Sequence, residues 1–394
     1  MTKRFLSLLL FAVLCLIHCA HQPPPAPPPK EKVKTEFLLI GYKSLSHQTD
    51  NLQEVLEKKK AIYHAIKNLS STNNIVIIYD ASGSMREKIG ASGPKKYEAA
   101  YEGLKQIGTL FRTSDDVRLF VFGSKKPSGI TPDGVIIQKD YIRAIEASGD
   151  VELVYSSSRE GFNQKDYWAA INFLGSEKAY IGDTPIGYGV LKAHQIIKEK
   201  PNAKIILITD GEETGPLLAK SISKDKAWEE RLRKRYPNYD ELTISAFESI
   251  KKLVADNIHF SPITYGLGGS VAGKPNREKE IQSIREFYRK LATESGSIYL
   301  EAVTPLELLN AFMDAEMMSL TYGLYSLEPD KKNQLVAKGK IGISLMVEEG
   351  RYLLKTNTEQ SFEQLVELKP QIKNVYFFNM DKEGKLRIFR EGAE

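Results

Sequence analysis

From residue 73 to residue 317, apolar stretches of strand length alternate with stretches of helical periodicity, and this alternation restricts the fold more than any other feature. Residues 75–79 form a continuous apolar run, which is typical of a strand covered on both faces. Further strands are expected at residues 117–122, 205–208, 259–267 and 298–300, with amphipathic helices between them. The pattern predicts an α/β fold with a doubly wound, mostly parallel sheet flanked by helices. Ligands of such sheets bind beyond the carboxyl ends of the strands.

A loop rich in side-chain oxygens follows the first of these strands. Asp80, Ser82 and Ser84 occupy alternate positions, and Gly83 lets the backbone turn sharply between the two serines. Such a loop can direct its oxygen atoms at one point. Oxygen ligands suit a hard cation such as Mg²⁺, Mn²⁺ or Ca²⁺ and do not suit zinc or copper.

This loop resembles the Asp-x-Ser-x-Ser motif that begins the metal-ion-dependent adhesion site of von Willebrand factor A-type (VWA) domains. Residues 182–187 resemble the threonine loop of that site, and residues 209–211 resemble the turn with its distal aspartate. Lys96 also resembles the corresponding lysine of bacterial members. Each motif is weak alone, but their order along residues 73–317 makes the resemblance specific. The ligands that it implies are Asp80, Ser82, Ser84, Thr184 and Asp210.

The resemblance implies a divalent cation, with Mg²⁺ as the first expectation and Mn²⁺ or Ca²⁺ as alternatives. The hydroxyls of Ser82, Ser84 and Thr184 would bind it directly, whereas Asp80 and Asp210 would act mostly through water. Neutral ligands compensate the charge of the ion poorly, and protein-bound Mg²⁺ keeps several waters. We therefore expect a protein partner to supply an Asp or Glu carboxylate in place of one water. A purely structural role for the ion is the alternative.

The first eighteen residues are typical of an export signal. Lys3 and Arg4 precede an apolar run at residues 5–17, which is shorter than the roughly 20 residues that a membrane-spanning helix needs. The formal net charge is +5, and removal of these two basic residues would leave +3. So small an excess does not indicate binding to nucleic acid.

The only two cysteines, Cys15 and Cys19, lie at the end of this segment, which leaves no cysteine for a disulfide or a zinc site in the folded part. Residues 16–19 resemble a bacterial lipobox, in which Cys19 would become the lipidated first residue of the mature chain. His18 departs from that pattern, because a small residue is usual there. Ala20 favours the outer over the inner membrane under the family's sorting rule. The alternative is that Cys19 is only part of a secretory signal.

The sequence divides into five segments. After the signal peptide at residues 1–18, a Pro-rich linker is expected at 19–35, a helical segment at 36–72, the VWA-like domain at 73–317 and a β-rich module at 328–394. Residues 51–69 have an apolar face that should pack against the central domain. Two insertions are expected within the domain, at residues 125–176 and 217–239.

Two other classes of function are less well supported. A phosphatase that used Asp80 as nucleophile would need a second aspartate at position 82, where a serine stands. A serine hydrolase would need a Gly-x-Ser-x-Gly turn, and none of the six histidines lies in a catalytic motif. We therefore expect a binding protein without enzymatic activity. An envelope scaffold whose working part is the C-terminal module is the remaining alternative.

Overall fold

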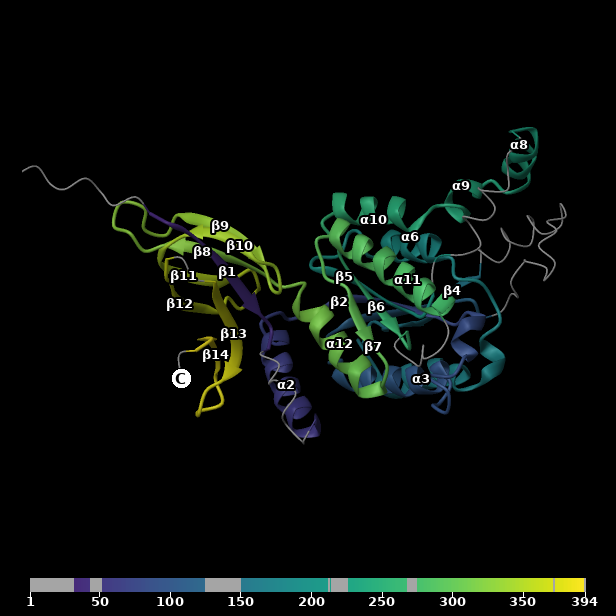
Figure 1. The fold of residues 1–394 in the computed structure, drawn as a ribbon, viewed down its shortest axis with the longest axis horizontal. Coiled ribbons are helices and arrows are strands. Elements are labelled where there is room, and N and C mark those ends of the chain that lie inside the picture. Colours follow the sequence, from purple (N-terminus) through teal and green to yellow (C-terminus); the bar gives the residue numbers. More distant parts are fainter. Residues whose placement is uncertain are drawn as a thin grey trace, which may run out of the picture.

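A six-stranded sheet forms the centre of the larger part of the molecule in the computed structural model (Figure 1). The structure describes residues 32–42, 52–124, 150–211, 213, 226–267, 275–370 and 373–392. All neighbouring strands pair in parallel except β4, which pairs antiparallel with β3. In spatial order the strands are β4 (Val151–Ser156), β3 (Asp116–Phe122), β2 (Asn74–Asp80), β5 (Ala203–Thr209), β6 (His259–Tyr265) and β7 (Leu300–Ala302).

Helices cover both faces of this sheet. Side chains of β2 alternate between two apolar cores, with Ile77 and Tyr79 in one and Val76 and Ile78 in the other. The first core includes helices α3 (Lys96–Ile107) and α12 (Pro305–Met317). The second includes α6 (Ile186–Ile197), α10 (Ala246–Ala255) and α11 (Pro275–Glu294). The predicted α/β class, a mostly parallel sheet flanked by helices, is confirmed.

Shorter elements complete this part of the chain. Helices α8 (Lys226–Arg235) and α9 (Tyr239–Leu242) contribute Leu232 and Tyr239 to a small apolar cluster. The remaining helices are α2 (Leu52–Lys67), α5 (Gln164–Ile171), α8 (Lys226–Arg235), α9 (Tyr239–Leu242) and the 3₁₀ turns η1 (Gly83–Arg86), η2 (Gly108–Leu110), η3 (Asn172–Gly175) and η4 (Glu177–Ala179).

A separate all-β region, which we call the β module, consists of two four-stranded sheets. One sheet has the order β10 (Leu345–Glu348), β1 (Lys34–Ile40), β13 (Asn374–Met380) and β14 (Leu386–Arg390). The other has the order β12 (Glu363–Leu368), β11 (Gly350–Thr356), β8 (Thr321–Ser326) and β9 (Leu335–Lys340). Phe37, Tyr322 and Phe378 lie in the same apolar core as α3 and α12, so the two parts share one core.

Several boundaries differ from those expected. Residues 34–40 were assigned to the linker and the helical segment, but they form β1, which pairs with β10 and β13 of the β module. The module also begins at Thr321, before residue 328. Within the first expected insertion, Val151–Ser156 joins the large sheet as β4. Residues 125–149 and 217–225 of the two insertions lie outside the described residues.

Helix α2 lies between the large domain and the β module (Figure 1). Its Lys59 forms an ion pair of 2.6 Å with Asp314 of α12 and donates to the side-chain oxygen of Asn310 at 2.7 Å. Lys67, at its end, forms a 2.9 Å ion pair with Asp115. The helix packs against the central domain, as its sequence indicates, and it also contacts β13 and β14.

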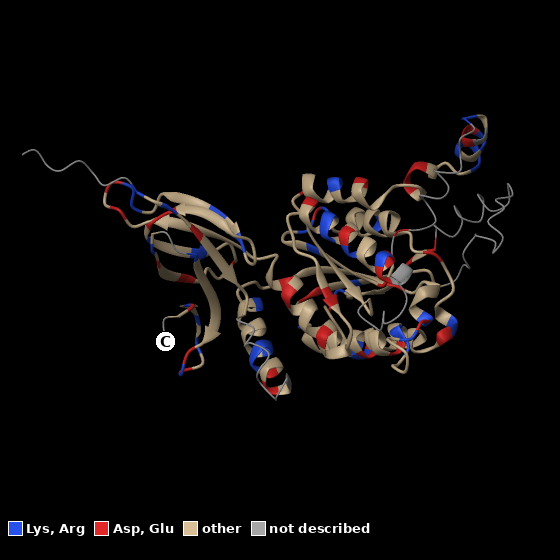
Figure 2. Cartoon of the chain, in the orientation of Figure 1, with Lys and Arg blue, Asp and Glu red and all other residues tan. Residues whose placement is uncertain are grey.

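Charged residues of both signs are distributed over the helices and loops, whereas the strands of the large sheet carry few of them (Figure 2). Within the part of the chain that the structure describes, no helix has the length and apolar character needed to cross a membrane.

Candidate metal centre

Three loops bring hydroxyl and carboxylate groups together at the carboxyl edge of the large sheet. Ser84 Oγ donates to Asp210 Oδ1 at 2.7 Å, and the hydroxyls of Ser82 and Ser84 lie 3.0 Å apart. A Cβ atom added at Gly211 would lie 3.7 Å from Ser84 Oγ and 4.0 Å from Thr184 Oγ1. The Asp-x-Ser-x-Ser loop and the distal aspartate are thus hydrogen-bonded to each other, and the Thr184 hydroxyl lies beside the same glycine.

Asp80 is held next to this cluster by hydrogen bonds to both of its carboxylate oxygens. Its Oδ1 accepts from the Ser82 backbone N–H at 2.7 Å, and its Oδ2 accepts from Thr209 Oγ1 at 2.6 Å. The side chain is fully buried. Burial, and then the charge of Asp210, raises the pKa of Asp80 to about 7, although its hydrogen bonds favour the ionised form. Positive charge at this point would relieve the repulsion between the two carboxylates.

Lys96 supplies one positive charge to the cluster. Its Nζ atom lies 2.7 Å from Asp210 Oδ2 and 3.2 Å from Glu87 Oε2. Burial opposes the charge of the lysine, but the two carboxylates outweigh this effect and hold its pKa above the ordinary value. Asp210 therefore bridges Lys96 and Ser84, one through each oxygen. The position of Lys96 after the first motif marked it in the sequence, but its contact with Asp210 was not predicted.

Backbone contacts hold the first two loops against each other. The Gly83 N–H donates to the Gly182 carbonyl at 3.1 Å, and the Gly182 N–H donates to the Gly123 carbonyl at 2.8 Å. Gly123 has φ of +75°, and a Cβ atom there would lie 2.8 Å from both the Asp183 carbonyl oxygen and the Ser82 nitrogen. Only glycine satisfies both constraints without strain. The sequence signal for this residue is its position directly after β3.

Glu213 and Tyr288 support the third loop. One Glu213 oxygen accepts from the Gly187 N–H at 2.7 Å, and the other accepts from the Ala246 N–H at 3.0 Å. The carboxylate thereby satisfies free amides at the beginning of α6 and α10. Tyr288 donates its hydroxyl to the Gly211 carbonyl at 2.6 Å. Neither residue lies in a motif, so the sequence alone did not reveal them.

The donor set fits a hard divalent cation. It combines three hydroxyls with two carboxylates, and oxygen ligands of this kind are those that Mg²⁺ and Mn²⁺ prefer. Among the described residues, no group of three or more His, Cys, Asp and Glu side chains is placed to hold a metal. The ligand roles of Asp80, Ser82, Ser84, Thr184 and Asp210 remain predictions.

Histidines that the sequence assigned to packing lie away from this cluster. His194 Nε2 is 2.5 Å from Asp256 Oδ2 on the outer face of α6, and His259 Nε2 is 2.8 Å from Ser261 Oγ in β6. His64 is half-buried on α2, where burial lowers its pKa. Cys19 lies outside the described residues.

Comparisons with known proteins give only distant similarity. No family model matches the sequence, and no curated protein matches it. Among solved structures, a von Willebrand factor type A protein from Catenulispora acidiphila has 15% identity and a TM-score of 0.37, over 80% of this chain and 68% of its own. The manganese-loaded TRAP protein of Plasmodium vivax has 12% identity and a TM-score of 0.34, over 75% and 94% of the two chains.

Proximal thread matrix protein 1 from the mussel byssus has 14% identity and a TM-score of 0.35, over 64% of this chain. The chain spans only 46% of the length of that protein. The fold class therefore rests on the strand order and the helix layers described above.

Proposed function

We propose that this chain is an exported VWA-type binding protein that holds a divalent cation, Mg²⁺ in the first place, at the carboxyl edge of its large sheet. The hydroxyls of Ser82, Ser84 and Thr184 would bind the ion, and Asp80 and Asp210 would orient its waters. When bound, the ion would supply an electrophilic position for an Asp or Glu carboxylate of a protein partner. The protein would bind that partner without chemical turnover.

One observation supports this proposal, namely that predicted ligands from the loops after β2 and β5, far apart in the sequence, are joined by direct hydrogen bonds. Ser84 and Asp210 are separated by 126 positions and yet are joined by a 2.7 Å hydrogen bond. Asp80 and Thr209, separated by 129 positions, are joined by one of 2.6 Å. A loop edge that only needed stability would not require buried carboxylates, which cost free energy unless positive charge compensates them.

Export and anchoring rest on the N-terminal sequence alone. Residues 1–18 would direct secretion, and a lipid on Cys19 would attach the chain to a membrane, with the outer membrane favoured over the inner. Mass spectrometry of the mature N-terminus tests this part. A chain that begins at a diacylated Cys19 is expected, whereas an unmodified N-terminus elsewhere would refute the anchor.

Binding of Mn²⁺ to the full chain tests the metal site, because free Mn²⁺ is measured directly by electron paramagnetic resonance. Thr184→Ala removes a ligand hydroxyl and should weaken binding by at least about tenfold, since even outer-shell partners of a metal matter by 10–100-fold. Thr293→Ala is the matched control, because Thr293 is exposed on α11 and its hydroxyl donates to the Arg289 carbonyl of its own helix at 2.8 Å. Equal affinity of the wild type, Thr184→Ala and Thr293→Ala for Mn²⁺ would refute the metal site.

Partner capture tests the role of the ion. Proteins retained from envelope extracts by the wild type should be lost with a chelator and with Thr184→Ala, and kept with Thr293→Ala. Replacement of the contacting Asp or Glu of a retained partner by Asn or Gln should abolish binding. If Mn²⁺ binds but the retained proteins do not depend on it, the ion is structural and the scaffold alternative holds.

A further inference from the structure

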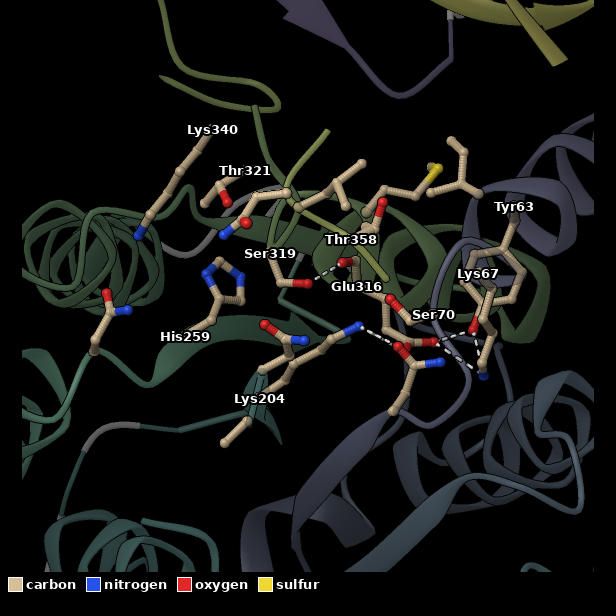
Figure 3. Close-up of a pocket in the computed structure, with 18 residues that line it drawn as sticks. Tyr63, Lys67, Ser70, Lys204, His259, Glu316, Ser319, Thr321, Lys340 and Thr358 are labelled. Carbon is tan, nitrogen blue, oxygen red and sulfur yellow. Dashed lines mark hydrogen bonds and ion pairs between the residues drawn. The ribbon is translucent and has the colours of Figure 1, made fainter. Parts of the chain in front are cut away.

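A polar cavity lies at the opposite edge of the large sheet, where the sheet meets the β module (Figure 3). Its volume is about 140 Å³. The lining residues come from α2, from the amino ends of β5 and β6, from the end of α12 and from β9. Because β2 has seven residues, this edge lies about 20 Å from the candidate metal centre. The cavity is therefore independent of the proposed function.

The charges around this cavity do not balance. Lys67, Lys204 and Lys340 line it, whereas Glu316 is its only acidic lining residue among those described. Glu316 already accepts from the Tyr63 hydroxyl and lies 3.4 Å from Lys204 Nζ and 3.7 Å from Lys67 Nζ. Its negative charge is thus shared by two of the three lysines.

Lys340 differs from the other two lysines in its charge partners. Lys67 forms an ion pair with Asp115 at 2.9 Å, and both Lys67 and Lys204 lie near Glu316. Within the described part of the chain, by contrast, no carboxylate forms an ion pair with Lys340 Nζ. Figure 3 shows the Lys340 side chain extending from β9 toward His259 on β6. The lysine is half-buried, and burial lowers its pKa. A charge in this position is stabilised by any anion that enters the cavity.

His259 is a buried imidazole in the lining of this cavity. Its side chain is 7% exposed, and Nε2 lies 2.8 Å from Ser261 Oγ. Burial, then Lys340 and Lys204, lowers the pKa of His259 to about 3. The imidazole is therefore neutral near pH 7 and can act as a hydrogen-bonding group beside the two lysines.

We propose that this cavity binds a small oxyanion, a carboxylate or phosphate group, with Lys340 as its principal charge partner. One water takes about 30 Å³ of liquid volume, so a cavity of about 140 Å³ has room for a group of this size. Thr321 and Asn257 border the same space and offer polar side chains. The ligand contacts both the large domain and the β module.

The oxyanion belongs to a larger molecule. A second cavity of about 790 Å³ adjoins the first, and both are lined by Lys340 and Thr321. Its walls include Tyr325 and Lys338, and also Lys355, whose Nζ atom lies 2.8 Å from Glu363 Oε1 and 5.5 Å from the centre of the Tyr325 ring. Basic and aromatic side chains in one cavity suit the remainder of an anionic small molecule.

Calorimetric titration of the full chain with inorganic phosphate and, separately, with succinate tests the proposal at constant ionic strength. The wild type should bind at least one of the two, and the one that binds identifies the group. Lys340→Met should weaken that binding by at least tenfold, and Lys340→Arg should retain most of it, because the charge is kept. Lys382→Met is the matched control, since Lys382 is an exposed lysine in the turn between β13 and β14.

Two results would overturn the proposal. One is the absence of binding of both anions to the wild type at millimolar concentration. The other is equal binding by wild type, Lys340→Met and Lys382→Met. Far-ultraviolet circular dichroism establishes that each variant is folded, and Lys340→Arg separates loss of charge from loss of structure. Mn²⁺ binding at the other edge should be unchanged in every variant, so this test and the test of the metal centre fail independently.

Discussion

Replacement of Lys96 by Met removes the buried cation that pairs with Asp210. The two atoms lie 2.7 Å apart, and the side chains are 4% and 0% exposed. Removal of one partner from a buried ion pair costs about 3–5 kcal/mol, because the other charge stays buried without compensation. Asp80 is a second buried carboxylate in the same cluster. We therefore expect Lys96→Met to lower the free energy of unfolding by about 3–5 kcal/mol when no divalent cation is present.

Saturation with Mg²⁺ should reverse much of this loss, because the ion would replace the missing positive charge. A ligand at 100 times its dissociation constant stabilises the native state by about 2.7 kcal/mol. Urea unfolding, followed by tryptophan fluorescence, measures both effects with EDTA and with Mg²⁺. Of the two tryptophans in the sequence, Trp168 lies in α5 of the large domain, and its signal reports on that domain.

Lys95→Met is the matched control. Lys95 Nζ lies 2.5 Å from Glu177, but the side chains are 30% and 46% exposed, and exposed ion pairs contribute about 0–1 kcal/mol. If Lys96→Met in EDTA is no more destabilising than Lys95→Met, the reasoning about the buried cluster is wrong.

Three further outcomes are expected. Gly123→Ala should weaken Mn²⁺ binding by at least about tenfold, because a Cβ atom would meet backbone atoms of two site loops at 2.8 Å; electron paramagnetic resonance measures it. Burial opposes ionisation of Asp115, but Lys67 and Arg112 outweigh it and hold its pKa below the ordinary value. This stabilisation is present above the unfolded-state pKa of about 4 and is lost as pH falls through the folded-state pKa. In Asp115→Asn the free energy of unfolding, measured by urea titrations from about pH 7 to about pH 2, should therefore fall less steeply with decreasing pH than in the wild type. Removal of residues 32–41 should expose β10 and β13 and abolish hydrogen-exchange protection in β13, whereas retained protection would show that β1 is dispensable.

The parallel sheet was predictable because its central strands are buried on both faces. Every residue of β2, β5 and β6 is buried, and in β2 and β5 this burial is matched by continuous apolar runs at residues 75–79 and 205–208. Strand β4 was assigned to an insertion, because it is a half-exposed edge strand with a mixed pattern. Strand β1 was missed for another reason. Its partners are far away in the sequence, since Phe37 pairs with Leu345 and with Asn374.

In the candidate site, too, residues close together in the sequence were predictable, whereas contacts between distant residues were not. Asp80, Ser82 and Ser84 were found by their spacing within one loop. The contact of Lys96 with Asp210 spans 114 positions, and that of Thr209 with Asp80 spans 129. Only the tertiary fold brings such pairs together, so residue spacing could not reveal them.

The position of β1 determines how the molecule would carry mechanical load. If a lipid on Cys19 anchors the chain and a partner binds at the far edge of the large sheet, as proposed, tension would run lengthwise through Lys34–Ile40. This strand is held on both sides, antiparallel to β10 and parallel to β13. Its hydrogen bonds to β10 and β13 would therefore be loaded together in shear, instead of breaking one after another. The β module would then resist force applied between the membrane anchor and the bound partner.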